Sequence, residues 1–160
     1  MYELDDYVIL GTVLWSNIPF NMAKYVQNKI NDYNYIYDDK LKPITPNKIN
    51  YLHYKNVEWL KNMIGKYLNK KIIVITHHLP SFKLIPSKYD NNPINCAFAT
   101  DLEYLIKDNV LYWCCGHTHT SCNASINNCK LFVNPKGYPI NNNQNENQFY
   151  DKQFVFNVDE

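Results

Sequence analysis

Two stretches of the chain place histidines directly after an apolar run: Ile72-Ile73-Val74-Ile75-Thr76-His77-His78 and Val110-Leu111-Tyr112-Trp113-Cys114-Cys115-Gly116-His117-Thr118-His119. Continuous apolar runs of this length are typical of strands that are buried on both faces. Side chains two apart in an extended segment point the same way, so His117 and His119 can converge on one site. Gly116, which has no Cβ, suits a sharp turn before them. Four of the five histidines therefore lie at predicted strand ends, where open α/β sheets bind ligands.

The segments around these two runs predict an α/β fold. Thr45-Pro46 has the residues of a helix start, and apolar side chains recur at spacings of three and four through about Leu68. His53 lies within this helix and is interpreted as a structural residue. The order helix, strand, loop, helix, strand then indicates a partly parallel sheet, with Ile72–Thr76 and Val110–Cys114 as neighbouring central strands.

The remaining segments predict the edges of the same domain. Tyr7–Trp15 is a buried strand interrupted by a glycine, and the tyrosine-rich stretch 31–39 is either a short strand or an ordered flap. Thr100-Asp101-Leu102-Glu103 has the pattern of a capping box that opens a short helix. Three β-like runs indicate antiparallel strands that close the sheet: Cys122–Ile126, Lys130–Val133 and Gln153–Val158. A hairpin turn is expected at 127–128 and a solvated loop over 141–148.

Composition excludes several classes of protein. The net charge is +1 and charged residues are 19% of the chain, which predicts no nucleic-acid patch. The N-terminus is acidic where a signal peptide is basic, and no apolar run approaches the ~20 residues of a membrane span, so a soluble, cytoplasmic protein without a membrane partner is expected. Five cysteines, an odd number, indicate free thiols.

Four ordered motifs resemble the C-terminal half of the calcineurin-like metallophosphoesterases: Thr76-His77-His78-Leu79-Pro80-Ser81, Pro93-Ile94-Asn95-Cys96-Ala97-Phe98, Trp113-Cys114-Cys115-Gly116-His117-Thr118-His119 and Asn134-Pro135-Lys136-Gly137-Tyr138-Pro139. Upstream segments around 10–16 and 52–60 also resemble one subgroup of that family. The resemblance implies that 1–160 is a partial phosphoesterase domain, the C-terminal portion of a β-sandwich flanked by helices with a mixed parallel and antiparallel sheet.

The resemblance also implies a chemistry, the metal-dependent hydrolysis of phosphate mono- or diesters. Carried over by motif, His77 and His117 would bind one divalent ion and His119 a second, the ions being manganese, zinc or iron. His78 is adjacent to His77 on the opposite face of the strand, so it is expected to point away from the metal. The motifs assign no further catalytic residue in this chain.

The departures from the family pattern are equally specific. The N-terminal Asp-x-His, Gly-Asp-x-x-Asp and Gly-Asn-His motifs are absent, and Lys136 replaces the arginine of the Asn-Pro-Arg-Gly-Tyr-Pro loop. The expected partner is a separately encoded N-terminal half that supplies the other ligands, and the chain alone is expected to be inactive. The alternative is a non-catalytic remnant or binding module. A third and weaker interpretation is a structural zinc site formed by Cys114, Cys115, His117, His119 and Cys122. It is weaker because adjacent cysteines at a strand end face opposite sides.

Overall fold

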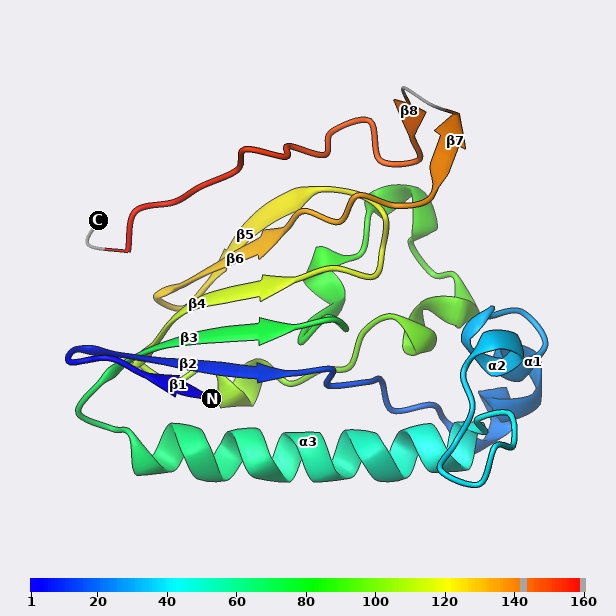
Figure 1. The fold of residues 1–160 in the computed structure, drawn as a ribbon, viewed down its shortest axis with the longest axis horizontal. Helices are drawn as coiled ribbons and strands as arrows, with labels where there is room; N and C mark the ends of the chain where they lie inside the picture. Colours follow the sequence, from blue (N-terminus) through cyan, green and yellow to red (C-terminus); the bar gives the residue numbers. More distant parts are fainter. Residues whose placement is uncertain (142–143, 159–160) are drawn as a thin grey trace.

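The centre of the computed structural model, which describes residues 1–141 and 144–158, is one six-stranded sheet (Figure 1). Its strands follow the order β1-β2-β3-β4-β6-β5; they are β1 (Tyr2–Glu3), β2 (Tyr7–Thr12), β3 (Lys71–Thr76), β4 (Val110–Cys115), β5 (Cys122–Ile126) and β6 (Cys129–Val133). Strands β2, β3, β4 and β6 run parallel, while β1 and β5 pair antiparallel at the edges. The prediction of a mixed sheet, with β3 and β4 as central neighbours, is confirmed.

Helix α3 (Pro46–Lys66) runs along one face of this sheet (Figure 1). The other elements are short: α1 (Ala23–Gln27), α2 (Asp32–Tyr35), the 3-10 turns Phe20–Met22, Phe82–Leu84, Ser87–Tyr89, Pro93–Ala97 and Glu103–Leu105, and the separate pair β7 (Pro139–Asn141) and β8 (Gln144–Asn145). Within the described ranges, no helix combines the length and apolarity that a membrane crossing requires.

The predicted start of α3 is confirmed by its cap. The Thr45 side chain accepts a hydrogen bond from the backbone N–H of Lys48 at 3.2 Å, and Pro46 occupies the first helical position, where no N–H is needed. Ile49, Leu60 and Ile64 on its inner face are buried. The helix ends at Lys66, two residues before the predicted end.

The prediction that β3 is buried on both faces is wrong. Ile72 and Val74 are fully buried on the α3 side, but Ile75 on the other side is 46% exposed. The reason is that other segments cover the sheet face opposite α3 only in part. Rings of the C-terminal segment lie against it, with Phe156 stacked on Phe132 at a centroid distance of 4.6 Å.

The C-terminal segment Gln153–Val158 is not a strand, in contrast to the prediction. Its alternating aromatic side chains pack on the sheet without a backbone ladder, and the hydroxyls of Tyr7 and Tyr112 donate to the Val158 carbonyl at 2.6 and 3.2 Å. The predicted hairpin turn between β5 and β6 is confirmed, with Asn127 in the left-handed conformation (φ 52°).

The predicted capping box at Thr100–Glu103 does not form. Thr100 Oγ1 instead accepts the backbone N–H of Asn17 at 2.9 Å, and the Glu103 carboxylate accepts the Ser81 hydroxyl at 2.6 Å. These long-range contacts take the side chains that a local cap would use, so only the 3-10 turn Glu103–Leu105 follows.

The predicted solvated loop over 141–148 is also only partly present. Residues 142 and 143 lie outside the described residues, Gln144–Asn145 forms β8, and Asn147 is buried. The Asn147 amide donates to Ser121 Oγ and to the Pro135 carbonyl, so its burial leaves these N–H groups satisfied.

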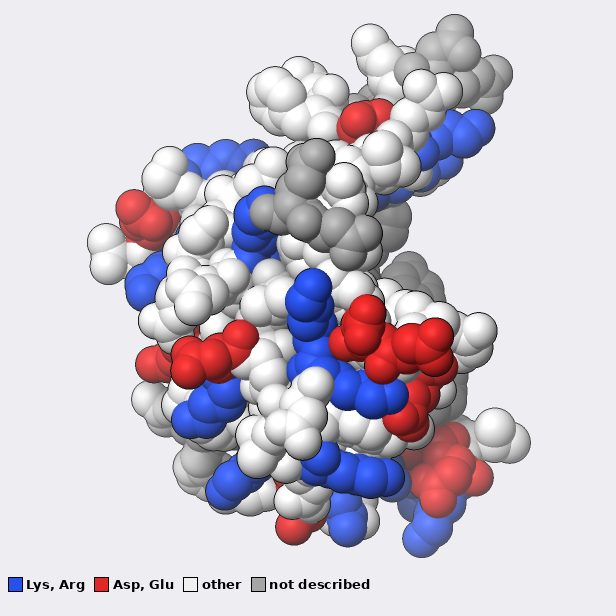
Figure 2. Space-filling view, turned by 90° about the vertical axis from the view of Figure 1, so that its left-hand side faces the viewer, with Lys and Arg blue, Asp and Glu red and all other residues white. Residues whose placement is uncertain are grey.

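Surface charge agrees with the low net charge. On the face drawn in Figure 2, lysine side chains lie beside acidic side chains, several of which gather toward the right of the view. All five cysteines are free thiols, as the odd number predicted.

Candidate functional site

The candidate site lies where the parallel neighbours β3 and β4 end. His77 and His78 follow β3 directly, and His117 follows β4 after one glycine. The backbone N–H of Gly116 donates to the His77 carbonyl at 3.0 Å, which ties the two strand ends together. Parallel pairing therefore brings together side chains that are forty residues apart in the sequence, as the strand-then-histidine pattern predicted.

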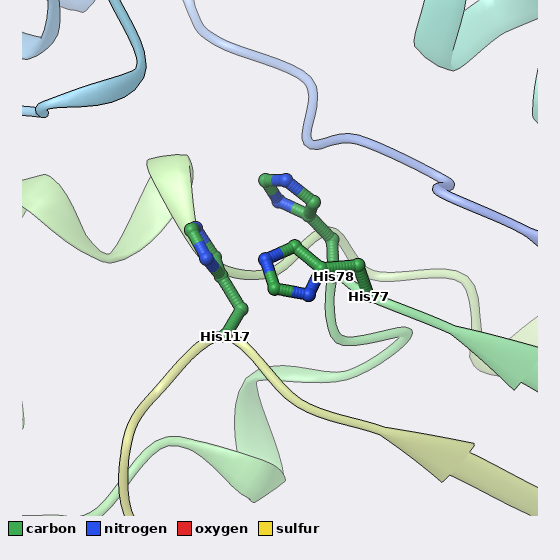
Figure 3. A group of neighbouring side chains, drawn as sticks. All are labelled: His77, His78 and His117. Atoms are coloured by element: carbon green, nitrogen blue, oxygen red, sulfur yellow. The ribbon is translucent and has the colours of Figure 1, made fainter. Parts of the chain in front are cut away.

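Three imidazoles meet at this edge (Figure 3). One ring nitrogen from each of His77, His78 and His117 lies within 4.8 Å of the others. The ring centroid of His117 is 4.7 Å from that of His77 and 4.1 Å from that of His78. Nitrogen ligands at these separations can hold a metal ion, and the expectation that His77 and His117 lie at one site is confirmed.

His78 joins the cluster, although the alternation of side chains along a strand predicted that it points away. The strand ends at Thr76, so alternation no longer applies. The backbone N–H groups of His77 and His78 both donate to the Val13 carbonyl, at 3.3 and 3.2 Å, and Thr76 Oγ1 donates to the His78 carbonyl at 2.7 Å. These bonds turn the chain and bring both rings to the same side.

Two nitrogens of the cluster are buried without a partner. The Nε2 atoms of His78 and His117 have no hydrogen-bond partner, while His78 Nδ1 lies 2.9 Å from the Ser16 hydroxyl. An orphaned buried nitrogen is costly, and a bound cation would satisfy it. Burial lowers the pKa of His117 to about 3 and that of His78 well below its ordinary value. Both rings are therefore neutral at pH 7, the form that binds metals.

The loop after β4 holds its histidines in an unusual backbone conformation. His117 and His119 have φ values of 65° and 50°, in the left-handed region that non-glycine residues rarely adopt. Gly116, for which a sharp turn was predicted, is not left-handed, and a Cβ there would have only ordinary contacts of 3.7 Å or more. Such strain persists only where the surrounding structure imposes it, which is common at functional sites.

His119, the third predicted ligand, is placed differently from the other two. It lies outside the three-histidine group, although it lines the same pocket. Its Nδ1 lies 2.8 Å from Glu146 Oε2, and its ring meets the Tyr138 ring edge to face at 4.7 Å. Lys136 is exposed and does not line this pocket.

The pocket in front of the cluster has a volume of about 500 Å³. Asp32 of α2 and Lys29 also line this pocket, and Tyr89, Phe98 and Tyr138 add aromatic walls. Burial raises the pKa of Asp32, and the electrostatic interaction with His77 opposes that rise. Asp32 and Glu146 could not be recognised from the sequence, because they occur in a tyrosine-rich and an asparagine-rich stretch that carry no motif.

His53 is a structural residue, as predicted. It is buried, and its Nδ1 lies 3.1 Å from the carbonyl oxygens of both Leu14 and Trp15. These two residues have positive φ values of 72° and 54°, so His53 supports a strained loop. The next residue, Ser16, contacts His78, which places His53 behind the site rather than in it.

The alternative structural zinc site finds no support among residues 1–141 and 144–158. The one group of three potential ligands in that part of the chain contains only histidines. Burial raises the pKa of the Cys114, Cys115 and Cys122 thiols, which disfavours the thiolate form that binds zinc.

Comparison with known proteins adds one relative. No protein-family profile matches the chain. The chain is 31% identical over 148 residues to the uncharacterized protein L509 of Acanthamoeba polyphaga mimivirus, a match that covers 86% of this chain and 52% of the viral protein. The chain thus spans about half the length of the curated relative it matches.

Proposed function

We propose that this chain is the histidine-bearing part of a calcineurin-like metallophosphoesterase, which hydrolyses phosphate mono- or diesters with divalent metal ions. The observation that carries the proposal is the cluster of His77, His78 and His117 at the ends of two parallel strands, with two buried and unpartnered nitrogens. The four ordered motifs of the sequence support the same family.

The residues of the cluster fit a divalent cation. His77 and His117 would hold one ion, with His78 as a further nitrogen ligand that the family pattern does not predict, and His119 would contribute from the same pocket to a second. When bound, such an ion acts as a Lewis acid toward phosphoryl oxygens. Three neutral nitrogens supply no negative charge to balance a divalent ion, and Asp32, which interacts with His77, would supply it.

The protein's own side chains also prepare the pocket for a phosphate ester. Lys29 at its rim supplies a positive charge for phosphoryl oxygens, and Tyr89, Phe98 and Tyr138 supply apolar surface for an organic group. A volume of about 500 Å³ is within the roughly 300–1,000 Å³ of small-molecule sites.

A second polypeptide segment is part of the proposal. The sheet face opposite α3 leaves Ile75 46% exposed, and the viral relative is about twice as long as the matched region. An additional layer on this face would complete the β-sandwich of the family and supply its carboxylate and asparagine ligands. Exposed apolar side chains on a sheet face favour such association.

The decisive experiment measures manganese- and zinc-dependent hydrolysis of aryl phosphate mono- and diesters. The chain alone should bind metal weakly and show almost no turnover, since each missing ligand costs orders of magnitude in rate. Adding a polypeptide with the three N-terminal motifs should restore turnover, and the viral relative outside the matched region is the first to try. His117→Ala should abolish this gain.

Two results would count against the proposal. Histidine-dependent turnover by the stable, monomeric chain alone would show that no part of the site is missing. Histidine-dependent metal binding without turnover in any combination would favour the alternative of a non-catalytic binding module.

A further inference from the structure

The contact between His119 and Glu146 joins two segments that are 27 residues apart in the sequence. His119 Nδ1 lies 2.8 Å from Glu146 Oε2, and the backbone N–H of Tyr138 donates to the same oxygen at 3.4 Å. An ionised carboxylate only accepts hydrogen bonds, so this contact requires the proton of the neutral imidazole to be on Nδ1. The other ring nitrogen, Nε2, then keeps its lone pair.

Several contacts hold Glu146 in this place. Its backbone N–H donates to the Tyr138 carbonyl at 2.8 Å, and the next residue, Asn147, is buried. Gly137 has a φ of 72°, and a Cβ there would lie 3.1 Å from the Cβ of Glu146 and 3.4 Å from that of His119. The absence of a side chain at Gly137 therefore lets the three segments meet closely.

We propose that Glu146 is a positioning residue that holds neutral His119 in its Nδ1–H tautomer, so that Nε2 remains an unprotonated ligand for a divalent metal ion. The choice of a metal ion as the ligand rests on the proposed function, whereas the tautomer is a property of the chain itself. Metal-binding histidines commonly donate their second N–H to a carboxylate in this way, which fixes the ring and raises its basicity.

The test is a long-range proton–nitrogen NMR correlation on the metal-free, nitrogen-labelled chain at about pH 8, where solvated imidazoles are neutral. The wild-type spectrum should show His119 protonated at Nδ1. Glu146→Gln and Glu146→Ala should shift the population toward the Nε2–H form. Glu58→Gln is the matched control, because it makes the same chemical change on the exposed side of α3 and should leave His119 unaltered.

Zinc titrations of the same samples separate the two parts of the inference. Zinc should shift the His119 Nε2 signal of the wild type, and Glu146→Gln should weaken zinc binding by roughly 10–100-fold. A wild-type His119 protonated at Nε2, or an unaltered tautomer in both Glu146 variants, would overturn the positioning role. If the Glu146 variants change the His119 tautomer but zinc does not shift the His119 nitrogen signals, the positioning role stands and the metal assignment is overturned.

Discussion

Lowering the pH from about 7.5 to about 5 should destabilise the metal-free fold through its buried histidines. Burial lowers the pKa of His117 to about 3, whereas an imidazole in the unfolded chain titrates near 6.5. Between these values the unfolded state binds a proton that the folded state does not. The stability contributed by neutral His117 is therefore complete above about pH 6.5 and is lost as the pH falls toward 3.

The two pKa values set the magnitude. A single group with these pKa values removes about 2 kcal/mol from the free energy of unfolding between pH 7.5 and pH 5. Burial also lowers the pKa of His78, which adds a loss in the same direction.

Urea unfolding at both pH values, followed by tryptophan fluorescence, measures this loss. In His117→Gln the decrease in unfolding free energy between the two pH values should be about 2 kcal/mol smaller than in the wild type. Thr118→Ser changes the neighbouring residue without removing a titratable group, so it should keep the wild-type pH dependence. Equal pH dependence in His117→Gln and the wild type would refute the conclusion that burial keeps His117 neutral.

Calorimetry with zinc or manganese should show loss of binding in His117→Ala and in His119→Ala, and wild-type affinity in both variants would remove the metal assignment. Asp32→Asn takes away the carboxylate that interacts with His77, so zinc affinity should fall about tenfold, and an unchanged dissociation constant would exclude Asp32 from the site. His53→Leu should cost about 1–3 kcal/mol of stability in urea unfolding, because one buried and one partly buried carbonyl lose their partner. Stability unchanged in that variant would contradict the supporting role of His53.

The elements that the sequence predicted correctly are those specified by local chemistry. Thr45 and Pro46 mark the start of α3 because a side-chain oxygen can accept an early helical N–H and proline needs none. The apolar runs of β3 and β4 form strands, and Asn127 makes the β5–β6 turn because asparagine tolerates a positive φ. The convergence of His77 and His117 followed from parallel pairing of the two strands.

Other features depend on contacts between distant segments, and only the tertiary structure decided them. His78 turns into the cluster because its backbone bonds to Val13, 65 positions earlier, override strand alternation. Asp32 and Glu146 enter the pocket through the packing of segments without a recognisable pattern. The apolar sequence of β3 specified a strand by itself, but the exposure of Ile75 depends on how far other segments cover the sheet. Local propensity determines where strands and helices form, whereas the side chains that share a site are determined by long-range packing.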